Sequence, residues 1–251
     1  MKAGLIIQAR TGSTRLPGKV VRSFYDEASI LDLVVERLAR NRHGLGLYVA
    51  TTDQPADDAL AARCADKGVA CFRGDEHDVL RRFIGCADAY GLQQIVRVCA
   101  DNPFLDLDLL EAMVDRGRAE AADYAGYALD DGTPAIQTHL GFFCEFVTLK
   151  ALRRVEAATN DAAAREHVTA YVYQHPDAFK LAFLDTPPLL QNLKRVRLTV
   201  DTAEDFETAQ QVYRTIRESG QNVRLESIAW ALARHPELSS RMARQIRLNQ
   251  K

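Results

Sequence analysis

The stretch that decides the fold reads Gly4-Leu5-Ile6-Ile7-Gln8-Ala9-Arg10-Thr11-Gly12-Ser13-Thr14-Arg15-Leu16-Pro17-Gly18-Lys19. Its apolar start, residues 4–7, is too short for a helix and is typical of a buried parallel strand. The loop that follows holds three cations, three hydroxyl groups and two glycines. Glycines let backbone amides approach phosphate oxygens, and cations neutralise those oxygens. The stretch therefore predicts a polyphosphate-binding loop at the end of a strand.

Two other interpretations of this loop, a Walker A loop and a solvated basic turn, are disfavoured. It is not a Walker A loop, because Val20 follows Lys19 where Ser or Thr is required and the glycine spacing differs. A P-loop NTPase is thereby disfavoured. A solvated basic turn is the second alternative, since Arg and Lys are common on surfaces. The position directly after a buried strand favours the phosphate loop.

Outward from the loop, short apolar runs alternate with stretches of helical periodicity. We expect helices over residues 30–40, 56–67, 79–90 and 107–121, and strands over residues 45–51, 69–72 and 94–99. Repeated βα units imply a mainly parallel sheet with helices on both faces, and ligands bind at the carboxyl ends of its strands.

The second half of the chain has a mixed pattern. We expect strands over 136–140, 141–146, 179–184 and 195–200, and helices over 148–158, 162–174, 203–218 and 226–234. No Gly/Ser-rich linker or internal repeat divides the chain. The sequence thus predicts one α/β domain over residues 1–251, with a Rossmann-like, mixed and mainly parallel sheet.

Composition narrows the class of protein. The 251 residues are 47% hydrophobic and 26% charged, which is ordinary for a globular chain with a real core. The formal net charge of −2 disfavours a nucleic-acid partner. An export signal or a membrane-spanning run of apolar residues is not evident. The five cysteines are odd in number and never spaced C-x-x-C, so we expect small core residues in a reducing cytoplasm.

The loop resembles the nucleotide-binding signature of the sugar-acid cytidylyltransferases, which include CMP-sialic acid synthetases and 3-deoxy-manno-octulosonate cytidylyltransferases. It is most similar to the spore coat polysaccharide branch, whose pattern I-I-Q-A-R-x-G-S-T-R-L-P-G-K the chain matches through Lys19. Gln8 stands where the sialic acid and octulosonate enzymes usually carry proline. That difference weakens any transfer of their sugar specificity to this chain.

Further segments carry the same resemblance over nearly the whole chain. They are Ala50-Thr51-Thr52-Asp53, the stretch from Arg73 to Arg82, Arg165-Glu166-His167-Val168-Thr169 and Val200-Asp201-Thr202-Ala203-Glu204-Asp205. The resemblance implies that the sugar contacts Arg165 and His167. It implies that the nucleotide contacts Gln8, Ala9, Arg10, Gly12, Ser13, Thr14, Lys19, Thr51, Thr52, Asp53 and Asp75.

Two aspartates are the candidate metal ligands. Asp101 follows the expected strand 94–99, and the resemblance implies that it holds a catalytic Mg²⁺. With Asp201 it would supply two hard oxygen ligands, while phosphate oxygens and water complete the octahedron. Because two carboxylates brought together repel one another, we expect Mg²⁺ to occupy the gap between them. The histidines lack the spacing of a zinc centre.

Helix capping competes with a functional role at several carboxylates. Asp75 and Asp78 can equally begin the helix 79–90, and Thr202 with Asp205 forms an ordinary helix start that favours capping for Asp205. His167, on the expected helix 162–174, is either packed or in the sugar pocket.

The resemblance implies a Mg²⁺-dependent nucleotidyltransferase that moves CMP from CTP to a sugar acid and releases pyrophosphate, for surface polysaccharide or glycan synthesis. Arg10, Arg15 and Lys19 would stabilise the developing phosphate charge. One rival is a nucleotide-sugar glycosyltransferase, whose D-x-D spelling occurs at Asp106-Leu107-Asp108, although these residues also begin a helix. Another is a non-catalytic nucleotide-binding protein, which the presence of both candidate ligands disfavours.

The resemblance and one apolar stretch together predict a homodimer. The stretch is Gly141-Phe142-Phe143-Cys144, which a compact monomer is not expected to bury completely. The sugar pocket should come from residues 124–146 and 165–173.

Overall fold

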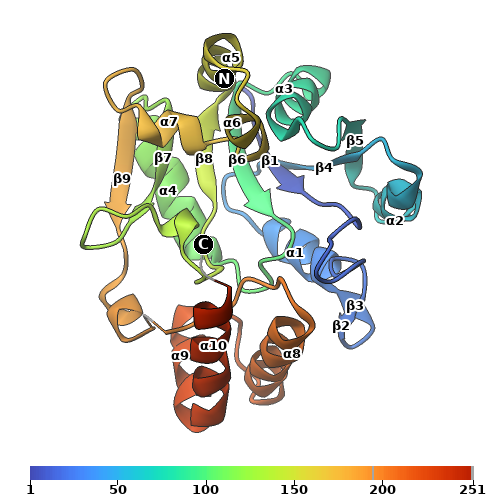
Figure 1. Cartoon of the computed structure of the whole chain (residues 1–251), viewed down its shortest axis with the longest axis vertical. Coiled ribbons are helices and arrows are strands. Elements are labelled where there is room, and N and C mark those ends of the chain that lie inside the picture. The colour runs from blue at the N-terminus through green and yellow to red at the C-terminus, as the bar shows by residue number, and fades with distance from the viewer. Residues whose placement is uncertain (194, 250–251) are drawn as a thin grey trace.

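A seven-stranded sheet organises the computed structural model, which describes residues 1–193 and 195–249 (Figure 1). The strands lie side by side in the order β5-β4-β1-β6-β8-β7-β9. Their bounds are β1 (Ala3–Gln8), β4 (Gly46–Thr52), β5 (Ala70–Gly74), β6 (Gln94–Cys99), β7 (Tyr124–Ala128), β8 (Glu145–Thr148) and β9 (Leu181–Asp185). A separate hairpin pairs β2 (Ser23–Tyr25) with β3 (Ala28–Ser29).

The sheet is mixed and mainly parallel, as predicted. Strand β1 pairs in parallel with β4 and β6, β4 pairs in parallel with β5, and β7 pairs in parallel with β9. Only β8 runs against its neighbours β6 and β7. Strand β1 therefore lies in the middle of the parallel half, and its side chains from Gly4 to Ile7 are buried.

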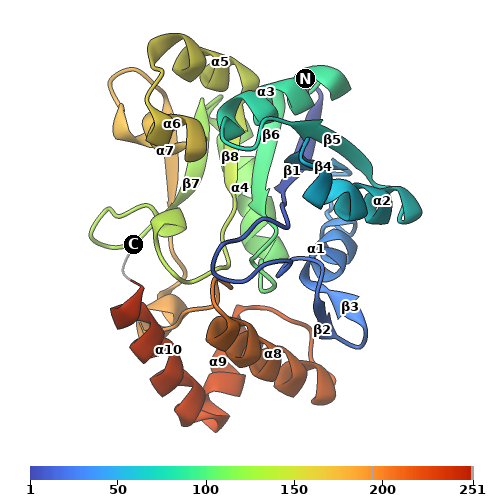
Figure 2. The ribbon, with the colours of Figure 1, turned by 45° about the vertical axis from the view of Figure 1, so that its right-hand side comes forward.

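Helices cover both faces of the sheet. One face packs against α3 (Val79–Tyr90), α5 (Leu149–Ala158) and α7 (Ala170–Gln174), with α6 (Ala162–Glu166) beside α3. The other packs against α1 (Ile30–Leu38), α2 (Asp58–Asp66) and α4 (Leu107–Ala119). Helices α8 (Ala203–Glu218), α9 (Leu225–Arg234) and α10 (Pro236–Leu248) extend this second core and gather at one end of the molecule (Figures 1 and 2).

Several helices begin where a side chain caps them. Thr202 caps α8 and forms a capping box with Asp205, and Asp78 accepts a hydrogen bond from the amide of Arg81 in α3. Asp106 caps α4 by accepting from the amides of Asp108 and Leu109. Short 3₁₀ turns occupy Pro55–Asp57, Ala135–Gln137 and Pro188–Leu193.

Four expected elements differ from the structure. Residues 136–140 and most of 141–146 form a 3₁₀ turn and irregular chain, and residues 195–200 form no strand. Instead, the amides of Leu198 and Thr199 donate to the carbonyl of His139, and the amide of Val200 donates to that of Asp101. Apolar side chains in 195–200 are buried without a ladder partner, so their alternation imitates a strand. The expected helix 162–174 is broken into α6 and α7 around His167.

Among the residues that the structure describes, no helix has the length and apolar character needed to cross a membrane.

Candidate active site

The loop after β1 is folded back on itself, because the amides of Ser13 and Gly18 both donate to the carbonyl of Thr11. Gly18 adopts a φ of 69°, a conformation that favours glycine, and its amide donates to the carbonyl of Thr11 over 2.9 Å. Within residues 1–193 and 195–249, the amides of Gly12, Thr14 and Arg15 make no hydrogen bond to the protein. The loop passes near the ends of β1 and β6 on the side of α8 (Figure 2). Free amides beside a cation form the kind of concavity that binds phosphate.

Asp57, in the 3₁₀ turn before α2, anchors the start of this loop. Its carboxylate accepts from the amide and the hydroxyl of Thr11, each over 2.7 Å, and from the hydroxyl of Thr52. Burial alone would raise the pKa of Asp57, but these hydrogen bonds outweigh it and the pKa lies below its usual value. Asp57 was not predicted as a site residue, because its partner in the loop, Thr11, lies 46 positions away along the chain.

Lys19, at the end of the loop, holds both predicted metal ligands. Its ammonium lies 2.8 Å from Asp101 and 3.4 Å from Asp201, and it donates to the carbonyl of Val200. Burial would lower the pKa of Lys19, but the two carboxylates raise it above the usual value. The ammonium is therefore a fixed positive charge beside the two carboxylates.

The aspartates converge as predicted, but the expected reason is wrong in two respects. Asp201 ends no strand; it follows the irregular segment 195–200. Its carboxylate is positioned by Arg197, which donates to Asp201 over 2.9 Å and donates two hydrogen bonds to Asp205. A metal is also not required to bring the carboxylates together, because Lys19 supplies the cation that offsets their repulsion.

The capping alternative is confirmed at Asp205. Its carboxylate accepts from the amides of Asp201 and Thr202 and belongs to the capping box of α8. Burial would raise the pKa of Asp205, but Arg197 lowers it below the usual value. Arg197 is 1% exposed in its side chain, so this ion pair is an internal brace of the site.

A cleft of about 840 Å³ opens beside the two aspartates, a size suited to a substrate. Its lining includes Arg15, Asp101 and Asp201, and Arg15 lies 3.1 Å from Asp201. The remaining lining is mostly neutral or aromatic, and His167 is exposed within it. Residues from the regions expected to form the sugar pocket contribute to this remaining part: Thr133, Ala135, Ile136, Gln137, Thr138, Gly141, Phe143, His167, Thr169, Ala170 and Tyr173.

A buried ion pair supports the wall of the cleft. Arg97, in the middle of β6, lies 2.5 Å from Glu145 of β8. Glu145 also accepts from the hydroxyls of Tyr124 and Thr169, and Arg97 donates to the side-chain oxygen of Gln8 over 3.1 Å. The side-chain oxygen of Gln8, predicted to contact the nucleotide, thus accepts from Arg97. A charged residue inside the apolar run 94–99 was the signal that the sequence analysis missed.

The predicted nucleotide-binding residues Thr51, Thr52, Asp53 and Asp75 differ in their exposure and in their contacts. Thr51 and Thr52 are buried, and the hydroxyl of Thr52 donates a hydrogen bond to Asp57. Asp53 is exposed. Asp75 accepts from the amides of His77 and Asp78, so it shapes the turn before α3. Their contacts with a nucleotide remain predictions.

The loop residues also differ in their surroundings. Ala9 is buried at the end of β1, and its amide donates to Ala50. Ser13 accepts from the amide of Leu16 over 3.4 Å, while Thr14 is exposed. Arg10 lies 3.4 Å from Glu76, so this cation already has a partner across the loop.

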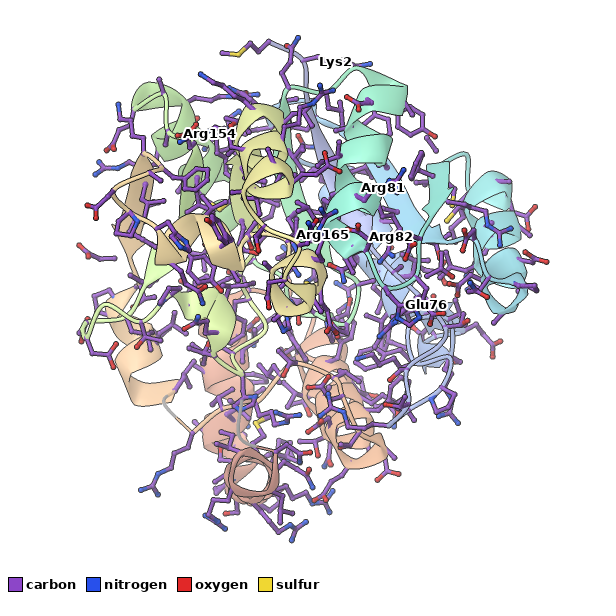
Figure 3. The ribbon with its side chains drawn as sticks, turned by 45° about the horizontal axis from the view of Figure 1, so that its top comes forward. Lys2, Glu76, Arg81, Arg82, Arg154 and Arg165 are labelled. Atoms are coloured by element: carbon purple, nitrogen blue, oxygen red, sulfur yellow. The ribbon has the colours of Figure 1, made fainter. Side chains whose placement is uncertain are left out.

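Arg165 is placed away from the cleft lining. Its guanidinium lies 2.7 Å from Asp78, the cap of α3, and thereby ties α6 to α3. Figure 3 shows Arg165 beside Arg81, Arg82 and Glu76 around the start of α3. Of the two predicted sugar residues, only His167 lines the cleft.

The D-x-D spelling begins α4, as its alternative interpretation stated. Asp106 is buried and accepts from the amides of Asp108, Leu109 and Leu225. Neither carboxylate lines the cleft.

Comparison with known proteins decides the family. Residues 5–229 match the family model described as "Cytidylyltransferase". The chain belongs to this family. The predicted resemblance is thereby confirmed, and the loop, Asp101 and Asp201 all fall within the matched part of this cytidylyltransferase.

Individual relatives span almost the entire cytidylyltransferase chain. The spore coat polysaccharide biosynthesis protein SpsF of Bacillus subtilis is 34% identical over 242 residues, which cover 94% of this chain and 95% of that protein. The 3-deoxy-manno-octulosonate cytidylyltransferase of Agrobacterium fabrum is 25% identical, covering 84% and 95%. The solved structure of a cytidylyltransferase from Leptospira borgpetersenii superimposes with a TM-score of 0.83 at 28% identity, covering 95% and 96%.

Proposed function

We propose that this cytidylyltransferase transfers CMP from CTP to a hydroxyl group of a sugar acid and releases pyrophosphate, in the synthesis of a surface polysaccharide or glycan. The observation that carries the proposal is the meeting of Lys19, from one segment, with Asp101 and Asp201, two cleft-lining residues from two other segments. The names of the relatives from Bacillus subtilis and Agrobacterium fabrum support the polysaccharide setting and the sugar-acid acceptor.

The residues of the loop would act mainly through position and charge. The acceptor oxygen attacks the α-phosphorus of CTP, and the bond to pyrophosphate breaks. The free amides of Gly12, Thr14 and Arg15 would bind phosphate oxygens, while Arg10, Arg15 and Lys19 would offset the charge that grows on them. Fixed donors need no reorganisation during the reaction, so they stabilise the transition state more than the bound substrates.

We also propose that the enzyme uses Mg²⁺, held by Asp101 and Asp201. Within the described residues, no group of three or more His, Cys, Asp or Glu side chains could hold a metal, so a complete protein cage is not expected. Two carboxylates that already share a cation fit an ion that takes one or two protein ligands and fills the rest with phosphate and water. When bound, the ion would neutralise phosphate charge and orient the triphosphate.

The test is a pyrophosphate-release screen of the four nucleoside triphosphates against nonulosonic, octulosonic and neutral sugars, with and without Mg²⁺. We expect release only with CTP, a sugar acid and Mg²⁺ together. Calorimetry should also give tighter binding of CTP than of ATP or GTP. Release with a neutral sugar alone, or equal binding of purine triphosphates, would contradict the proposal.

A glycosyltransferase has no specific support, because Asp106 and Asp108 begin α4 outside the cleft. We further propose a cytoplasmic homodimer, on the family resemblance. The apolar stretch that also suggested a dimer is buried inside one chain, with Phe142 at 1% and Phe143 at 4% exposure, so it gives no reason for a partner. Light scattering that gives the 28.0 kDa monomer at micromolar concentration would contradict the dimer.

A further inference from the structure

Two cysteines meet where α2 packs against the edge strand β5, away from the cleft. Cys64 lies in the last turn of α2 and is 3% exposed, and Cys71 lies in β5 and is partly exposed. Strand side chains alternate, and Phe72 packs with α3 on the opposite face. Cys71 therefore faces α2 and shares one apolar cluster with Cys64.

The end of α2 lies against the start of β5, because the amide of Val69 donates to the carbonyl of Cys64 over 2.9 Å, and the two thiols there are chemically unequal. The neighbouring Cys64 thiol lowers the pKa of Cys71 against the opposing effect of burial, and the nearby charge of Arg73 lowers it further. The neighbouring Cys71 and burial raise the pKa of Cys64 far above its usual value. Cys71 is thus both the more accessible thiol and the one that ionises first, which are the properties of an attacking thiolate.

This pair is mechanically connected to the phosphate loop. Asp57, which holds Thr11, lies in the turn immediately before α2. The other end of α2 is tied to α1, because Arg63 pairs with Asp32 and Lys67 lies 3.2 Å from the same carboxylate. Strand β5 is tied to the same region, because Arg73 donates to the carbonyl of Thr52 over 3.0 Å. A covalent link between Cys64 and Cys71 would hold α2 and Asp57 more rigidly against the sheet.

We propose that Cys64 and Cys71 form a reversible disulfide, a modification site that responds to small-molecule disulfides and stiffens the loop residues 9–19. The Cys71 thiolate attacks one sulfur of a disulfide such as glutathione disulfide, whose S–S bond breaks and whose leaving thiolate takes up a proton. Cys64 then loses its proton and attacks the Cys71 sulfur, which releases the second small thiol. Two protein thiols are oxidised and one small disulfide is reduced to two thiols.

The experiment uses the full chain, folded, in redox buffers of reduced and oxidised glutathione. Without a blocking reagent, the intact mass of the oxidised protein should be about 2 Da lower, which is the loss of two hydrogen atoms. After free thiols are blocked, the oxidised protein should carry two fewer blocking groups than the reduced one. Peptide mapping should identify the link Cys64–Cys71. Reduction should reverse it. In hydrogen–deuterium exchange, the peptide that contains Thr11 should exchange more slowly in the oxidised protein than in the reduced one. This readout needs no nucleotide, so it succeeds or fails independently of the proposed function.

Matched variants separate this pair from the other thiols. Cys64→Ala and Cys71→Ala should abolish the disulfide, and Cys64→Ala should retain a glutathione adduct on Cys71. Cys86→Ala, which removes a buried thiol on α3, should form the Cys64–Cys71 link like the natural chain. The proposal is overturned if the folded protein keeps both thiols at oxidising potentials, if mapping finds a different pair, or if exchange around Thr11 is unchanged after the link has formed.

Discussion

Lys19 donates a hydrogen bond of 2.8 Å to Asp101, which lies 82 positions further along the chain. Lys19 ends the loop after β1, and Asp101 follows β6, the strand next to β1 in the sheet. The parallel pairing of these strands brings the loop and the carboxylate to the same sheet edge. The same ammonium also reaches Asp201, so one cation organises the polar end of the cleft.

Replacing Lys19 should impair catalysis far more than folding. We expect Lys19→Ala to lower the rate of pyrophosphate release roughly 10²–10³-fold, as for the loss of one preorganised donor to a developing charge. Arg22→Ala removes an exposed cation just beyond the loop and should leave the rate nearly unchanged. An unaltered rate in Lys19→Ala would refute the role assigned to this side chain.

The same substitution should strengthen metal binding in the absence of nucleotide. The ammonium of Lys19 lies within 3.4 Å of both carboxylates, so it competes with any divalent ion for them. Its removal takes this cation away from both carboxylates, although Asp201 keeps its ion pairs with Arg15 and Arg197. We expect Mg²⁺ affinity to rise about tenfold, which equals about 1.4 kcal/mol. Calorimetric titration of Mg²⁺ into both proteins measures this. Equal or weaker binding by Lys19→Ala would show that the ion binds elsewhere.

Neutralising either aspartate should abolish Mg²⁺-dependent turnover and preserve the fold. Asp101→Asn and Asp201→Asn keep the size of the side chain and some hydrogen bonding but remove a ligand charge. Asp201→Asn also weakens the contact with Arg197, whose two bonds to Asp205 remain. Circular dichroism and pyrophosphate release check the two expectations. Asp108→Asn, in the first turn of α4, is the control and should stay active.

Local signals predicted the first half of the fold well. The bounds of α3 and β6 are the expected ones, because each is framed by residues that act within a few positions: Asp78 and Gly91 for α3, and the apolar run itself for β6. The phosphate-binding loop was predicted for the same reason, and its role stays a prediction. Its residues are contiguous, and their types alone state the chemistry.

Contacts between distant segments account for what the sequence analysis missed. Residues 196–200 are buried and alternate like a strand in sequence, and their hydrogen bonds go to His139 and Asp101 instead of to a neighbouring strand. Strand β7, rich in small residues, and the polar helix α10 were not expected at all. Arg97 and Arg197 brace the site, but their acidic partners Glu145 and Asp205 are recognised as partners only in the folded chain.

Asp57 should stabilise the protein in a pH-dependent manner. Its pKa in the folded state lies below the unfolded value of about 3.9, so its contribution is complete above that pH and is lost as the pH falls through the folded-state pKa. We expect Asp57→Asn to lower the free energy of unfolding by about 1.5–3 kcal/mol at pH 7, because charged hydrogen bonds to Thr11 and Thr52 are weakened. Urea unfolding should give a difference that shrinks at about pH 3. A constant difference would contradict this.

Gly141→Ala should be among the most damaging single-methyl additions in the chain. Gly141 has a φ of 71°, and a Cβ there would lie 2.8 Å from the carbonyl carbon of Leu198 and 2.9 Å from the amide nitrogen of Thr199. Those atoms are backbone, held by hydrogen bonds to His139, so they have little freedom to yield. Gly132→Ala is the matched control: its φ is 83°, but a Cβ there meets nothing within 4 Å. Both variants lose the conformational freedom of glycine, so their difference isolates the steric contact. We expect Gly141→Ala to lower the free energy of unfolding by about 1–3 kcal/mol more than Gly132→Ala does in urea unfolding.

Because Thr199 and Asp201 line the cleft next to this crossing, Gly141→Ala should also weaken CTP binding under conditions where it remains folded. Equal stability of the two variants would mean that the 139–141 and 198–199 segments separate easily, and the position of Asp201 would then need another support.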